Sequence, residues 1–157
     1  MRAQAISEAE QSIIELGGGV NYFSVLPGHL VEYAPKNLTK LVSRRQVYFI
    51  DIDLRVDDIR QLRRALEQFG SVDGLSLCGQ YVDNLWLENL PGKARVETLI
   101  LGETNVTADG LMELKRWPSL DLLVLESNKK TDDESIQELI DDFSRENVPV
   151  RVFVKGD

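Results

Sequence analysis

The sequence is poor in metal-binding and disulfide-forming residues, with one cysteine, Cys78, and one histidine, His29. A single cysteine excludes a disulfide within the chain. One cysteine and one histidine are also too few for a zinc site built from nitrogen and sulfur ligands. We therefore expect neither a metal site nor a cofactor.

Long apolar runs and an excess of positive charge are also missing. No stretch approaches the ~20 apolar residues that cross a bilayer, and the first ten residues lack the apolar segment of a secretory signal. We expect a cytoplasmic protein without membrane contact. The net charge of −8 argues against nucleic acid as a partner, because binding phosphates requires concentrated Lys and Arg. Acidic residues interrupt the local basic group at 36–64, which predicts a solvated mixed surface.

The sequence does contain an apolar pattern that recurs at a fixed spacing. In this pattern an apolar residue is followed by a leucine three residues later and by a second leucine five residues later. The triplet recurs every 24 residues, at Val72, Leu75 and Leu77, at Val96, Leu99 and Leu101, and at Leu120, Leu123 and Leu125. Each triplet predicts a short strand. Slightly longer steps extend the pattern upstream to strands at 47–52 and 20–25. Valines at every second position over 150–154 predict a last strand, whose pairing register with the strand before it stays open.

Between the strands the apolar residues change to helical spacing. Residues 7–16 and 57–69 predict two helices, and the glycines at 17–19 end the first of them. Three shorter stripes follow, formed by Leu87 and Leu90, by Leu111 and Leu114, and by Ile136 and Leu139. Good N-cap residues precede these stripes, namely Asp83 or Asn84, Thr107, and Thr131 or Asp132. Thr131 and Glu134 have the spacing of a capping box. Trp86 and Trp117 adjoin the stripes and are interpreted as packing residues.

The unit from Leu99 to Leu120 resembles the leucine-rich repeat, most closely the ribonuclease-inhibitor-like and cysteine-containing subclass in its short bacterial form. The polar position of that repeat falls on Gln80, Thr104 and Asn128. The match departs from the usual pattern at Asp109, which falls one place late, and at Arg55, which occupies a polar position.

The resemblance implies an α/β fold, a right-handed leucine-rich-repeat solenoid. About six parallel strands in sequential order would form a concave sheet, with helices on the convex side. Residues 1–157 would form a single domain. Residues 1–46 would hold the N-terminal helix and a degenerate first unit, 47–140 the regular repeats, and 141–157 a C-terminal cap strand.

Members of this family mostly bind other proteins, and their motif contains no catalytic residue. The resemblance therefore implies a non-catalytic interaction module with a protein partner. Because side chains alternate along a strand, the neighbours of the core leucines should face the concave side. The predicted partner-binding residues on that side are Tyr22, Phe49, Asp51, Asp53, Ser76, Thr98, Ile100, Leu122, Val124 and Glu126. Ile100, Leu122 and Val124 form an apolar patch among them, of the kind that marks a contact surface.

Two other interpretations stay open. The patch could instead be covered by the C-terminal segment or by a second copy of the chain. The chain would then be a structural or oligomerisation domain, or a fragment of a larger assembly. The run from Val47 to Asp53 also resembles the strand end of haloacid-dehalogenase-like phosphotransferases, which would give Asp51 and Asp53 a role with Mg²⁺. However, Leu54 and Arg55 follow where that family has a Gly or Val and a Thr.

Overall fold

The computed structural model describes residues 2–24, 43–48, 56–90, 95–117, 119–128 and 130–155. Its strands form a single six-stranded sheet in the order β1-β2-β3-β4-β5-β6. These are β1 (Gly19–Ser24), β2 (Ser43–Tyr48), β3 (Ser71–Cys78), β4 (Arg95–Gly102), β5 (Leu122–Glu126) and β6 (Arg151–Lys155). The helices are α1 (Arg2–Glu15), α4 (Val56–Phe69), α5 (Asn84–Asn89), α6 (Ala108–Leu111), the 3₁₀ helix η1 (Met112–Arg116) and α7 (Asp133–Arg145). The expected mixed α/β architecture is confirmed.

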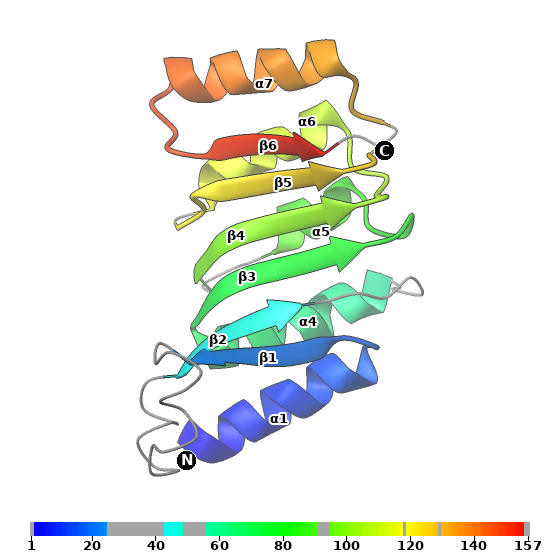
Figure 1. Cartoon of the computed structure of the whole chain (residues 1–157). Helices are drawn as coiled ribbons and strands as arrows, with labels where there is room; N and C mark the ends of the chain where they lie inside the picture. The colour runs from blue at the N-terminus through cyan, green and yellow to red at the C-terminus, as the bar shows by residue number, and fades with distance from the viewer. Residues whose placement is uncertain are drawn as a thin grey trace.

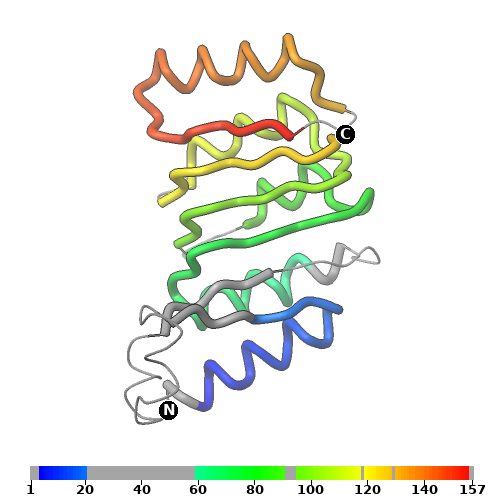
Figure 2. The backbone as a smooth tube through the Cα atoms, in the orientation of Figure 1, coloured from blue at the N-terminus to red at the C-terminus, as the bar shows by residue number. Residues whose placement is uncertain are grey.

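The 24-residue spacing of the sequence is the pairing register of the sheet. β3 pairs with β4 in parallel, Leu75 opposite Leu99, and β4 pairs with β5 in parallel, Leu99 opposite Leu123. β2 with β3 and β5 with β6 are parallel as well. Chain neighbours are therefore neighbours in space, and Figure 2 shows the colours following one another from α1 at one end to β6 and α7 at the other.

The helices cover one face of the sheet. Figure 1 shows α4, α5 and α6 behind the strands, and α1 and α7 extend this row by contacting α4 and α6. When two parallel strands follow one another in the chain, a crossover connection must return the chain to the start of the next strand, and this connection is usually a helix. The opposite face, toward the viewer in Figure 1, carries no helix of the described residues. We call it the open face.

The core lies between the sheet and the helices, and the predicted leucines fill it. Leu75, Leu77, Leu99 and Leu101 are completely buried. The three predicted helix stripes are buried against them, as are both tryptophans. The Trp117 indole N–H donates a hydrogen bond to the Leu87 carbonyl at 3.3 Å, which ties two successive units together.

The N-terminal part of the sheet differs from the prediction. β1 is antiparallel to β2, with Val20 opposite Val47, whereas the prediction had all strands parallel. Alternation of apolar residues reads the same in both directions along a strand, so it does not encode this orientation. β2 also lies earlier than the predicted 47–52, because Val47 rather than Ile50 pairs with Leu75. The predicted boundaries at 46/47 and 140/141 accordingly fall inside β2 and α7.

The ends of the helices follow the predicted caps with one exception. Asp83 and Thr107 cap α5 and α6, and the Asp132 carboxylate caps α7 by accepting from the Ser135 N–H at 2.8 Å. The predicted capping box at Thr131 is therefore wrong; the Thr131 hydroxyl instead donates to the Asn128 carbonyl. At the end of α1, Gly17 has a φ of +80° and its N–H bonds back to Ile14, which confirms the predicted glycine stop.

The turns after the strands repeat as closely as the strands do. Gly79, Glu103 and Ser127 each follow a strand, and all three have positive φ. One residue further on lie Thr104 and Asn128, two of the three polar positions named in the sequence. The Thr104 hydroxyl donates to the Asn128 side-chain oxygen at 2.6 Å. At the equivalent place of the preceding unit, the backbone carbonyl of Gln80 accepts a hydrogen bond from the Asn105 side chain.

Candidate functional site

The open face presents three rows of side chains, because the parallel strands pair in register. One row runs through Ser76, Ile100, Val124 and Phe153, which are register partners from β3 to β6. A second row runs through Gly74, Thr98, Leu122 and Arg151, and a third through Cys78, Gly102, Glu126 and Lys155. The first of these is apolar from β4 to β6.

The exposure of the apolar row rises toward β6. Ser76 is only 6% exposed and offers little surface, although it was among the predicted contact residues. Ile100 and Val124 are half-buried, and Phe153 is 57% exposed. Leu122, Thr98 and Glu126 are half-buried beside them, so six of the predicted contact residues lie in the described sheet on one face. Among the described residues, the accessible apolar surface of this face is concentrated over β4, β5 and β6.

Phe153 is the residue that the sequence interpretation missed. The prediction placed a strand at 150–154 but left its register open. The structure places Val152 opposite Leu123 and Val154 opposite Leu125, which turns the intervening Phe153 toward the open face. The alternation of Val152, Phe153 and Val154 carried this information, because an aromatic residue between two core-facing valines must point the other way.

The remaining predicted contact residues are not brought into this row by the described geometry. Phe49, Asp51 and Asp53 lie outside the described residues. Tyr22 lies in β1 opposite Arg45, and its side chain is likewise outside the described part. At the register position opposite Ser76, the structure has Tyr48 rather than the predicted Asp51.

The polar rim of the open face is made of two ion pairs, which join β6 to Glu126 of β5 and to Asp121 just before β5. Arg151 lies 2.5 Å from Asp121, and Lys155 lies 3.5 Å from Glu126. The two pairs stand on either side of Phe153 along β6. Arg151, Asp121 and Lys155 are well exposed and the Glu126 side chain is 39% exposed, so the pairs contribute little stability, about 0–1 kcal/mol each. An apolar centre with a charged rim is the usual composition of a protein contact surface.

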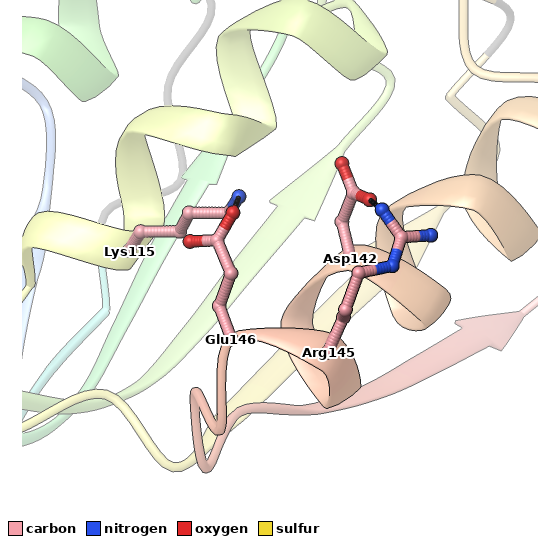
Figure 3. Close-up of polar contacts among 4 residues, drawn as sticks. All are labelled: Lys115, Asp142, Arg145 and Glu146. Atoms are coloured by element: carbon pink, nitrogen blue, oxygen red, sulfur yellow. Dashed lines mark hydrogen bonds and ion pairs between the residues drawn. The ribbon is translucent and has the colours of Figure 1, made fainter.

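The helix layer has a different character. Several of its charged side chains pair within the layer, including Lys115 with Glu146 at 2.6 Å and Arg145 with Asp142 at 2.7 Å. Both pairs are drawn in Figure 3. Arg63 and Glu67 form a similar pair on α4. Such internally paired surfaces are typical of solvated helix faces. The open face differs by its apolar row of Ile100, Val124 and Phe153, and this row favours it as the site of binding.

A groove of about 450 Å³ lies between α1 and α4, lined by Ser12, Arg60, Gln61, Arg64, Ala65 and Gln68. Small-molecule sites are usually enclosed and mostly apolar, whereas this groove is open and lined by long polar side chains. It is therefore the weaker candidate.

Two other kinds of site are absent from the described ranges. No three His, Cys, Asp or Glu side chains there gather closely enough to hold a metal ion. Within the same ranges, no helix has both the length and the apolar character needed to span a bilayer.

The chain matches no protein-family model, and no curated protein is similar to it.

Proposed function

We propose that this chain is a leucine-rich-repeat domain of the ribonuclease-inhibitor-like type, whose open sheet face binds another protein without catalysis. The repeat assignment is supported by the 24-residue register of β3, β4 and β5. It is supported further by the hydrogen bonds between Thr104 and Asn128, at the polar position of the repeat. A right-handed solenoid with the open face concave, in a cytoplasmic protein, completes this proposal.

The observation that carries the binding function is the apolar row formed by Ile100, Val124 and Phe153. The three residues are register partners on adjacent strands, and no described helix covers them. Apolar surface removed from water contributes about 25 cal/mol per Å², so covering such a row favours association.

The test replaces Ile100 and Val124 by aspartate together. A matched control carries the same change at two exposed apolar residues of the helix layer, Ile14→Asp and Leu85→Asp. We expect a protein captured from native lysate by the wild type to be lost with the open-face variant and retained with the control. If the open-face variant still folds and captures the same protein equally well, this face is not the binding site.

The second candidate is a structural role, in which another copy of this chain covers the same row. The half-exposed state of Ile100 and Val124 favours both candidates equally, and sedimentation separates them. A wild-type protein that self-associates, and an open-face variant that stays monomeric, would establish the structural role. The phosphotransferase alternative depends on Asp51 and Asp53, which lie outside the described residues.

A further inference from the structure

The backbone of β6 has hydrogen-bonding groups that no strand of the described sheet uses. β6 is last in the strand order and pairs only with β5. The Arg151 N–H donates to the Asp121 carbonyl at 2.8 Å, and the Lys155 carbonyl accepts from the Ser127 N–H at 3.3 Å. In a parallel pair, alternate residues direct both backbone groups to the same neighbour. Val152 and Val154 therefore direct their N–H and C=O groups to the free edge.

The side chains of this edge are apolar and accessible. Phe153 is 57% exposed on the open face, and Val154 is 43% exposed on the side that faces the helices. Val154 is the register partner of Leu125, which is 2% exposed. Val154 therefore lies in line with the buried residues of the core, but it is itself exposed. Native edge strands are usually protected by short length, by charged side chains or a proline, by a bulge, or by a covering segment. The centre of β6, Val152 to Val154, has no such residue.

The charges of β6 restrict which strand fits beside it. Arg151 and Lys155 lie two residues on either side of Phe153, and both are paired with carboxylates on the β5 side. A second copy, added by a two-fold axis with all five residues of β6 paired, would place Arg151 opposite Lys155 of that copy. Like charges directly opposite destabilise a strand pair. If the added strand instead carried acidic residues opposite Arg151 and Lys155, each of these cations would lie between two carboxylates.

We propose that β6 accepts an added strand from the partner protein, with an apolar residue opposite Phe153 and an acidic residue two positions away on either side. This inference rests on the proposed binding function and specifies its geometry. The pattern is symmetric about its centre, so it suits both a parallel and an antiparallel strand. The added strand would pair with Val152 and Val154 and extend the row of Ile100, Val124 and Phe153 by one residue.

The experiment titrates the protein with a capped synthetic peptide, TEVIVET, and records the backbone amide resonances by NMR. We expect the amides of Val152 and Val154 to shift and to gain protection from hydrogen exchange. A peptide with both acids replaced by lysine, TKVIVKT, should bind roughly tenfold more weakly, because two favourable charge pairs become unfavourable. Equal binding of the two peptides, or unchanged Val152 and Val154 amides at millimolar peptide, would overturn the proposal.

A pair of variants tests the backbone directly. Val154→Pro removes an N–H that points to the free edge and leaves every β5–β6 hydrogen bond in place, whereas Val154→Ala shortens the side chain and keeps the N–H. We expect the proline variant to lose the peptide and the alanine variant to keep it. If the proline variant does not fold, the two peptides on the wild type still decide. Self-association of the wild type that Val154→Pro abolishes would show that a second copy occupies the edge, against the proposal.

Failure of this inference is distinguishable from failure of the proposed function. If Ile100→Asp with Val124→Asp abolishes partner capture while Val154→Pro does not, the open face binds the partner and strand addition is wrong. If neither variant affects capture, both are wrong.

Discussion

Asn128 binds Thr104 across 24 residues of sequence, and it satisfies three buried groups at once. Its side-chain oxygen accepts from the Thr104 N–H at 2.8 Å and from the Thr104 hydroxyl at 2.6 Å. Its amide nitrogen donates to the Leu101 carbonyl at 2.7 Å. One side chain thus supplies both a donor and an acceptor to groups at and just after the end of the preceding strand.

Replacing Asn128 by alanine should therefore be costly. The variant removes the acceptor of two Thr104 donors and one donor to the Leu101 carbonyl, and Thr104 is buried. We expect a loss of about 2–4 kcal/mol in the free energy of unfolding, measured by urea denaturation. Asn105→Ala is the control, because Asn105 makes a single exposed bond to the Gln80 carbonyl. An equal loss in the two variants would contradict the role given to Asn128.

The turn residue Glu103 should be improved by glycine. Its φ of 53° lies in the left-handed region, where the equivalent residue of the preceding unit is Gly79. A side chain there costs roughly 1 kcal/mol, so Glu103→Gly should raise the free energy of unfolding by about 0.5–1 kcal/mol. Glu103→Ala keeps the Cβ and should give no such gain. If alanine stabilises as much as glycine, the effect comes from the lost charge.

Gly110 should not tolerate alanine, although it lies in a helix where alanine is ordinarily favoured. A Cβ at this position would overlap Oδ1 and Cγ of Asn84. Asn84 is held in place, because Oδ1 accepts from the Thr107 N–H and Nδ2 donates to the Thr107 hydroxyl, both at 3.0 Å. We expect Gly110→Ala to cost about 1–3 kcal/mol in thermal or urea unfolding. The same change in an Asn84→Ala background should cost less, and equal costs in both backgrounds would exclude the clash.

Asp132 should make stability depend on pH. The hydrogen bond from the Ser135 backbone N–H, aided by a side-chain bond from Ser135, lowers the pKa of the Asp132 carboxyl. A lowered pKa in the folded state means that the stabilisation is fully present above the unfolded pKa of about 3.9 and is lost as the pH falls through the folded value. Asp132→Ala should therefore destabilise at neutral pH and progressively less below a pH of about 4.

Urea unfolding across this range measures the difference between wild type and Asp132→Ala. Asp132→Asn provides the control, since asparagine caps a helix without titrating. If the difference between wild type and Asp132→Ala stays constant down to the lowest pH, the capping carboxylate does not carry the effect.

The strand positions were predicted most accurately where leucines recur on the same face of the sheet. Leucines at 75, 99 and 123 stand 24 residues apart, and the structure pairs them directly. Asp83 and Thr107 were predictable as caps because their side chains act on backbone groups two or three residues away. Such local and periodic relationships need no knowledge of distant contacts.

The N-terminal strands were less predictable for a physical reason. The run from Val47 to Ile52 has apolar residues at both odd and even positions, so several registers bury a similar amount of surface. The direction of β1 is set by pairing rather than by its own alternation. The open face was predictable in its centre, at Ile100 and Val124, but not at its edge, where the spacing between paired residues changes from 24 in β4–β5 to 29 in β5–β6.

The register of β3, β4 and β5 bears on how such a chain can change its length. Residues 98–102 of β4 each pair with the residue 24 positions before them and with the residue 24 positions after them. A duplication of one 24-residue segment would thus present each new strand with a neighbour of the kind it already has. Unequal recombination by one 24-residue segment would thus lengthen this chain without new contacts having to evolve first. A tandem copy of residues 99–122 would reproduce that event in the laboratory.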